Sequence, residues 1–159
     1  MTPTSPPITP TGMAALRARY DHLLGTERPA IVEVVSWAAG NGDRSENGDY
    51  IYGRKRMREI DRELTFLARR MKALRVIDPA QQQDRARVWF GATVVIADED
   101  DNQRELTMVG DDEQNAAQGL IGWSAPLARA LRGASVGDLR KVALPGGEKE
   151  WEVLSIGYP

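Results

Sequence analysis

The stretch MREIDRELTFLARRMKAL, residues 57–74, decides the fold of the first half of this chain. Its apolar residues follow one another at alternating intervals of three and four, as in a heptad repeat. They are Met57, Ile60, Leu64, Leu67, Met71 and Leu74. Because such positions share one face of a helix, the stretch predicts a long helix that packs against another helix along this seam. Pro79 ends the pattern.

The segment upstream predicts the partner helix. Thr9 and Pro10 are a helix start, with Thr9 as the cap and Pro10 in the first turn. Apolar residues from Leu16 to Leu23 then recur at helical intervals. Pro29 lacks a backbone donor, so we expect a kink or a weakened turn there.

Gly40-Asn41-Gly42-Asp43 lies between the two helical segments and predicts a chain reversal, since Gly and Asn accept backbone angles that branched residues resist. The sequence therefore predicts an antiparallel coiled-coil hairpin over residues 12–78, with its tip at 41–50. Residues 1–11 contain four prolines and are expected to form a flexible arm.

After a charged linker at 79–87, the pattern changes from helical to strand-like. Segments rich in β-branched and aromatic residues alternate with polar or Gly/Pro turns, which predicts a small, mainly antiparallel sheet domain over residues 88–159. Strands are expected at 88–97, 105–110, 139–144 and 151–156, with a short helix at 126–131. The whole chain is therefore expected to have an α+β fold.

Composition limits the functional classes. The chain has 159 residues, of which 42% are hydrophobic and 28% charged, with a net charge of −2. It has no cysteine and one histidine, His22, which excludes disulfides, thiolate metal sites and His-rich metal sites. The sequence has no long apolar segment and no apolar signal core near its start, so we expect a cytoplasmic protein without membrane contact.

Two carboxylates at the tip are the candidate chemical groups. Asp43 and Glu46 are three residues apart, so one helical turn would point both the same way. Such a pair can help to bind Mg²⁺ or orient a water molecule, but it supplies too few ligands for a stable Mg²⁺ site. The same spacing is also typical of a helix-capping box, and both interpretations stay open at this point.

The tip as a whole resembles a known family. GDRSENGDY, residues 42–50, followed by RKRMREID, residues 54–61, is similar to the tip and returning helix of bacterial Gre transcript-cleavage factors. The resemblance continues, in order, over nearly all of the chain after residue 8. It includes residues 8–12, 109–113, 126–131, 136–138 and 151–153.

The resemblance implies that the second domain is FKBP-like and docks on RNA polymerase, against a coiled coil of the β′ subunit at the rim of the secondary channel. The hairpin would enter that channel and meet the extruded 3′ end of backtracked RNA. Asp43 and Glu46 would then assist Mg²⁺ and its water jointly with polymerase, with no metal bound by the chain alone. The protein would thus be a monomeric cofactor of cleavage and not itself an enzyme.

The resemblance also implies roles for further residues. Supporting residues at the tip are Arg44, Ser45, Asn47 and Tyr50. The basic patch that would contact RNA consists of Arg54, Lys55, Arg56, Arg58, Arg62 and Arg69. The docking residues are Asp112, Ser124 and Pro126. Nine Lys/Arg and three acidic residues between 53 and 75 resemble the GreB type, although an ordinary solvated helix face has a similar composition.

Two residues depart from the family pattern. Ala125 stands where Ser commonly precedes the proline of the docking segment, and Gly48 stands where Ala is common. Two alternative functions are weighed against cleavage. One is a Gre-fold regulator that occupies the channel without promoting cleavage, and the other is a peptidyl-prolyl isomerase suggested by the FKBP-like domain. Retention of both tip carboxylates argues against the first, and the lack of an aromatic-lined pocket motif argues against the second.

Overall fold

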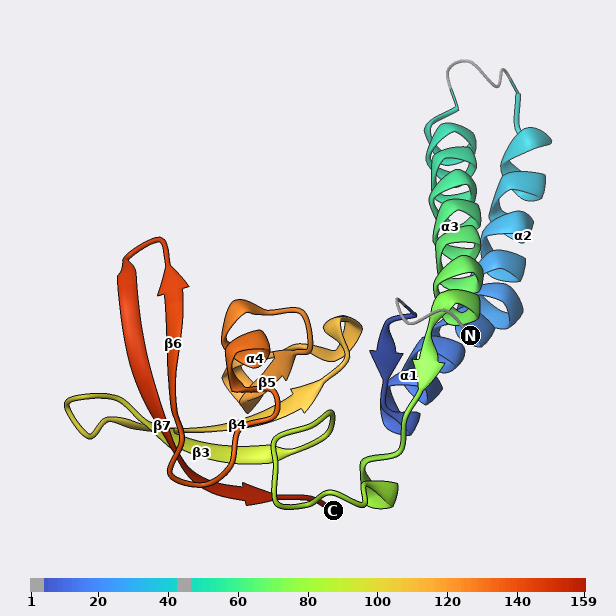
Figure 1. The fold of residues 1–159 in the computed structure, drawn as a ribbon. Helices are drawn as coiled ribbons and strands as arrows, with labels where there is room; N and C mark the ends of the chain where they lie inside the picture. The colour runs from blue at the N-terminus through green and yellow to red at the C-terminus, as the bar shows by residue number, and fades with distance from the viewer. Residues whose placement is uncertain (1–4, 43–46) are drawn as a thin grey trace. The chain divides into compact units, whose positions relative to one another are not determined.

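The computed structural model describes residues 5–42 and 47–159. The chain divides into two compact units, one of Met13–Ala73 and the other of Leu74–Pro159 together with the residues up to Gly12 (Figure 1). The N-terminal segment thus belongs to the same unit as the C-terminal sheet. No helix within the described residues is long and apolar enough to cross a bilayer.

The helical unit contains the predicted hairpin (Figure 1). Helix α1 (Pro10–His22) continues through a π-helical turn, η1 (Leu23–Glu27), into α2 (Arg28–Ala39), and α3 (Gly48–Ala73) packs against α2. The buried seam consists of Leu23, Ile60 and Leu67, surrounded by Leu16, Tyr20, Ile31, Leu64 and Met71. The heptad interpretation of α3 is confirmed, because four of these residues belong to the predicted apolar repeat.

The irregularity expected near Pro29 lies immediately before it. The N–H of Arg28 donates to the carbonyl of Leu23, five residues back, so one turn is wider than an α-helical turn. Pro29 has no N–H to continue the regular ladder, which explains why the helix changes its hydrogen-bonding pattern at this position.

The second unit is built on a five-stranded sheet with the order β5-β4-β3-β7-β6. The strands are β3 (Thr93–Ala97), β4 (Gln103–Val109), β5 (Leu120–Gly122), β6 (Leu139–Leu144) and β7 (Gly147–Gly157). Four of them pair antiparallel, as predicted, but β5 is parallel to β4, so the sheet is mixed. Helix α4 (Pro126–Leu131) buries Leu127, Ala128 and Leu131 in the core of this unit.

From residue 5 onwards, the N-terminal segment differs from the flexible arm predicted for residues 1–11. Strand β1 (Pro7–Ile8) pairs in parallel with β2 (Arg75–Val76), and Ile8 is fully buried. The carbonyls of Pro6 and Ile8 accept hydrogen bonds from Arg75 and Ile77, at 2.8 and 2.9 Å. A proline lacks only the donor, so this segment can serve as an edge strand through its acceptors.

A polar joint holds the start of α1 to the sheet unit. Thr9 caps α1 as predicted, since its Oγ1 accepts from the N–H of Gly12 at 3.0 Å. Glu113, from the 3₁₀ turn η3 (Asp111–Glu113), accepts from the N–H and the hydroxyl of Thr9 and from the N–H of Gly110. In a capping box, the Glu at the third helical position accepts from the backbone N–H of the N-cap residue. Here Glu113, which is far away in the sequence, accepts from the N–H of the N-cap residue Thr9 instead. A Cβ at position 12 would overlap Glu113, so the glycine makes room for it.

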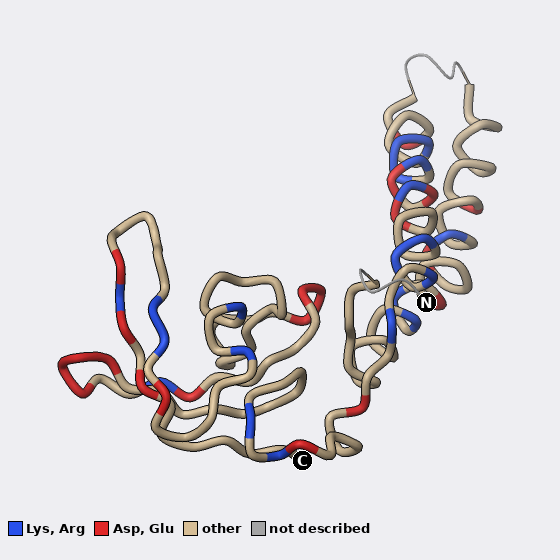
Figure 2. Tube along the Cα trace, in the orientation of Figure 1, with Lys and Arg blue, Asp and Glu red and all other residues tan. Residues whose placement is uncertain are grey.

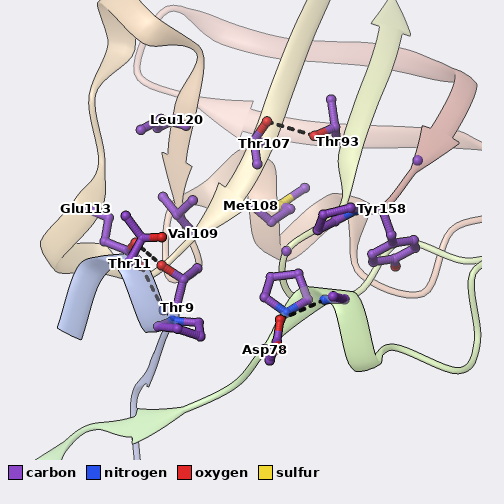
Figure 3. A pocket seen from close by; sticks show the side chains of 16 residues that line it. Thr9, Thr11, Asp78, Thr93, Thr107, Met108, Val109, Glu113, Leu120 and Tyr158 are labelled. Atoms are coloured by element: carbon purple, nitrogen blue, oxygen red, sulfur yellow. Dashed lines mark hydrogen bonds between the residues drawn. The ribbon is translucent and has the colours of Figure 1, made fainter. Parts of the chain in front are cut away.

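This joint borders a pocket of about 830 Å³ (Figure 3). Both carboxylates in its wall are engaged, Glu113 at the joint and Asp78 with the N–H of Ala80 at 3.0 Å. Tyr158 is the only aromatic side chain among the described residues that line it. Such a lining does not favour the isomerase alternative, which requires an aromatic-lined pocket for a proline ring.

Candidate functional site

The candidate site is the segment that joins α2 to α3. Asp43, Arg44, Ser45 and Glu46 lie outside the described residues, so their predicted roles stay predictions. Their flanks are described. Asn41 N–H donates to the carbonyl of Ala38 at 3.0 Å, and Gly42 has a positive φ of 114°, which agrees with the predicted reversal.

Asn47 connects the two helices at this end of the hairpin. Its Oδ1 accepts from the N–H of Tyr50 at 3.1 Å and so caps α3, while its Nδ2 donates to the carbonyl of Ala38 in α2 at 2.6 Å. One side chain thus ties the last turn of α2 to the first turn of α3. Among the described residues, Asn47 is therefore the residue whose side chain caps α3.

Gly53 sets the spacing of the helices one turn further along α3. It is buried, and a Cβ at this position would lie 2.6 Å from Cγ2 of Val35 in α2. The two helix backbones therefore approach more closely than an alanine would allow. The sequence analysis did not identify Gly53, because a glycine inside a helical pattern reads only as a weak helix former.

The six basic residues predicted to contact RNA fall into two groups. Arg56 Nη2 lies 2.8 Å from Glu27 Oε1, in a network where Arg19 also joins Glu27 and Glu63. A separate pair joins Arg28 to Asp61. The hydrogen bond from Arg56 is the main cause that lowers the pKa of Glu27. These pairs link α1, η1 and α2 to α3. Arg56 was predicted to contact RNA, but the structure gives it a partner within the hairpin.

The second group forms an exposed stripe, with blue bands along α3 in Figure 2. Within residues 5–42 and 47–159, none of its members forms an ion pair. They are Arg54, Lys55, Arg58, Arg62 and Arg69. Intervals of four, four and seven residues separate its arginines, so they return to one face of the helix. The face opposite the apolar seam therefore carries unpaired positive charge.

The predicted docking residues lie on neighbouring segments of the sheet unit. Asp112 is in η3, Ser124 follows β5, and Pro126 begins α4, and all three are exposed. Asp111 Oδ1 accepts from the N–H of Ser124 at 2.9 Å, which holds the first two segments together. Ala125 occupies the N-cap position of α4 and provides no side-chain hydrogen bond, as expected of an alanine where a serine is common.

The chain thus combines a helical hairpin that has an exposed basic face with a sheet domain that forms its own compact unit. Family comparisons match each part. The model described as "Transcription elongation factor, N-terminal" matches residues 6–76, and "Transcription elongation factor, GreA/GreB, C-term" matches residues 82–158.

Curated relatives agree with these matches. The chain is 48% identical to transcription elongation factor GreB of Neisseria meningitidis serogroup B over 95% of this chain and 93% of that protein. It is 44% identical to GreB of Pseudomonas aeruginosa over 98% and 92%. It is also similar to a solved structure, GreA factor homolog 1 of Thermus thermophilus, at 16% identity and a TM-score of 0.43, over 96% of this chain and 99% of that one. The chain belongs to the GreA/GreB family of transcription elongation factors and is of the GreB type.

Proposed function

We propose that this transcription elongation factor binds RNA polymerase and stimulates the polymerase's own cleavage of backtracked RNA. The hairpin enters the secondary channel and meets the extruded 3′ end, while the sheet unit docks on the β′ coiled coil through Asp112, Ser124 and Pro126. Cleavage creates a new 3′ end in the polymerase active site, so that an arrested complex can resume elongation. The factor acts as a monomer in the cytoplasm, where transcription takes place.

The observation that carries this proposal is the closure of the hairpin end by Asn47. Its two hydrogen bonds hold the last turn of α2 and the first turn of α3 together on either side of the segment that contains Asp43 and Glu46. Because the two helix ends are already fixed to each other, the described flanks of this segment lose little conformational entropy when a partner binds.

The donor set suits a metal that is shared with the partner. Carboxylate oxygens are the ligands that Mg²⁺ prefers, but two of them leave most of an octahedral shell to other groups. Asp43 and Glu46 would hold Mg²⁺ jointly with polymerase carboxylates and RNA phosphate oxygens, and the bound ion would supply Lewis acidity and an activated water. The role of this chain is to add negative charge and to orient the water.

The test is a cleavage assay on a stalled, backtracked polymerase complex with Mg²⁺. Wild-type protein should shorten the transcript faster than polymerase alone, and Asp43→Ala and Glu46→Ala should suppress this effect while polymerase binding is retained. Asp49→Ala is the matched control, since it removes an exposed acid from the first turn of α3 and should leave cleavage intact.

Two results would contradict the proposal. If the wild-type protein binds polymerase and yields no shortened transcript above the polymerase-alone rate, the chain is a channel-binding regulator without cleavage activity. If either tip variant cleaves normally at limiting Mg²⁺, the role assigned to that carboxylate is wrong.

A further inference from the structure

Two exposed aromatic residues stand beside the basic stripe of α3. Tyr52 is 63% and Phe66 is 59% exposed, although the helix has a buried seam on its other face. Leaving a large aromatic side chain in water forgoes the stabilisation that burial would provide. Single exposed aromatic residues are ordinary on a protein surface, so the case for these two rests on what surrounds them.

Helical spacing brings the aromatics next to unpaired positive charge. Phe66 is four residues after Arg62 and three before Arg69, and Tyr52 is three residues before Lys55. Side chains three or four residues apart are neighbours on a helix surface. Each ring is therefore adjacent to at least one cation that has no ion-pair partner within the described residues.

We propose that Tyr52 and Phe66 are stacking platforms for the bases of single-stranded RNA, whose phosphates contact the neighbouring basic residues. The inference rests on the proposed function, which brings extruded RNA to the hairpin, and it adds a base-stacking contact to the electrostatic one. Proteins that bind single strands without sequence preference combine these two features, a positive track for the backbone and aromatic rings for the bases.

The dimensions and charges of the surface favour RNA over a protein partner. Fourteen residues separate the two rings, which corresponds to about 21 Å along the helix at 1.5 Å per residue, enough for several nucleotides. Three acidic residues lie between the rings along the helix, and each is within 4 Å of an arginine, which moderates its repulsion of phosphate. The pairs are Glu59 with Arg56 at 3.9 Å, Asp61 with Arg28 at 2.8 Å and Glu63 with Arg19 at 2.8 Å. A purely apolar partner would provide no counter-charge for the five cations of the stripe, which form no ion pair among the described residues.

The test compares two probes with the full-length protein by fluorescence anisotropy. One is a short single-stranded RNA of mixed sequence, and the other is a ribose-phosphate chain of the same length without bases. Tyr52→Ala and Phe66→Ala should each weaken binding of the RNA about tenfold and leave binding of the baseless chain nearly unchanged. Phe66→Tyr should preserve RNA binding, because it keeps the ring.

Trp37→Ala is the matched control. Trp37 is 64% exposed on α2, whose one basic residue, Arg28, is paired with Asp61. Its loss should alter binding of neither probe. Arg62→Ala should weaken binding of both probes, because phosphate contacts do not depend on the bases. Circular dichroism of every variant should show unchanged helicity.

Three results would overturn the stacking proposal. The first is an equal loss on both probes for Phe66→Ala, and the second is no loss on either. The third is unchanged RNA binding together with weakened polymerase binding, which would make the aromatics a protein contact. The RNA-binding measurement contains no polymerase, so its failure would count against base stacking alone. The cleavage assay measures only transcript shortening, so its failure would count against the proposed function.

Discussion

Replacing Gly12 by alanine should lower the free energy of unfolding when Glu113 is present and raise it when Glu113 is replaced by alanine. In an ordinary helix, Gly→Ala stabilises by up to about 1 kcal/mol. Here the new Cβ would overlap the carboxyl group of Glu113, which must then move away from Thr9 and Gly110. We therefore expect Gly12→Ala to destabilise the sheet unit, in spite of its better helix propensity.

The magnitude follows from the hydrogen bonds at the joint. Glu113 accepts from two backbone N–H groups, at 3.1 and 2.8 Å, and from the Thr9 hydroxyl. Bonds to a charged acceptor contribute about 1.5–3 kcal/mol each, but one carboxylate shares all three, so we expect a loss of about 3 kcal/mol for Glu113→Ala. Gly12→Ala should lose most of the stability that these hydrogen bonds contribute and regain about 1 kcal/mol from the higher helix propensity of alanine. The net loss in the free energy of unfolding should be about 2 kcal/mol.

A double-mutant cycle measures the coupling. In the Glu113→Ala background, Gly12→Ala should stabilise by a few tenths to about 1 kcal/mol, so the coupling energy should be about 3 kcal/mol. Urea unfolding followed by tryptophan fluorescence suits the measurement, in a Trp37→Phe background that leaves only the tryptophans of the sheet unit. If Gly12→Ala has the same sign and size in both backgrounds, then Glu113 does not occupy the space above Gly12 and the joint is wrongly described.

Three further predictions concern other parts of the chain. Asn47→Ala should lower the stability of the helical unit by about 1–2 kcal/mol and reduce transcript cleavage without reducing polymerase binding. Asn47→Asp keeps the cap on α3 but loses the donor to the carbonyl of Ala38, so it should recover stability more than cleavage. Gly53→Ala should cost about 1–3 kcal/mol in thermal unfolding because its Cβ meets Val35, and a simultaneous Val35→Ala should relieve that cost. Burial would raise the pKa of Asp98, but hydrogen bonds, including one from Lys149, lower it to about 2. Its contribution to stability should therefore be complete above pH 3.8 and disappear as the pH falls towards 2, so the stability gap between wild type and Asp98→Asn should narrow over that interval.

Much of the architecture follows from local pattern. The heptad seam predicted α3 and its buried face, Thr9 and Pro10 predicted the start of α1, and the predicted bounds of α4 and β6 agree with the structure. Each of these features depends on residues within a few turns of one another. Periodicity, caps and turn residues record such short-range constraints directly.

Long-range pairings could not be predicted in the same way. The parallel pair of β1 with β2 joins residues 7–8 to residues 75–76, and β5 joins the sheet in parallel through three residues only. The proline-rich start therefore suggested a flexible arm, since nothing in its own sequence records the partner strand. A two- or three-residue strand has too short a pattern to predict its register.

In the candidate site, too, features that depend on nearby residues could be predicted and features that depend on distant residues could not. The sequence by itself determined the two tip carboxylates, the density of basic residues on α3 and the family resemblance, because each depends on the identity and spacing of nearby residues. Only the tertiary structure decided that Asn47 ties α2 to α3 and that Arg56 pairs with Glu27. The other five residues predicted to contact RNA form no ion pair within the described part of the chain. The physical reason is that a hydrogen bond or an ion pair depends on a distance in space, which residues far apart in the sequence acquire only when the chain folds.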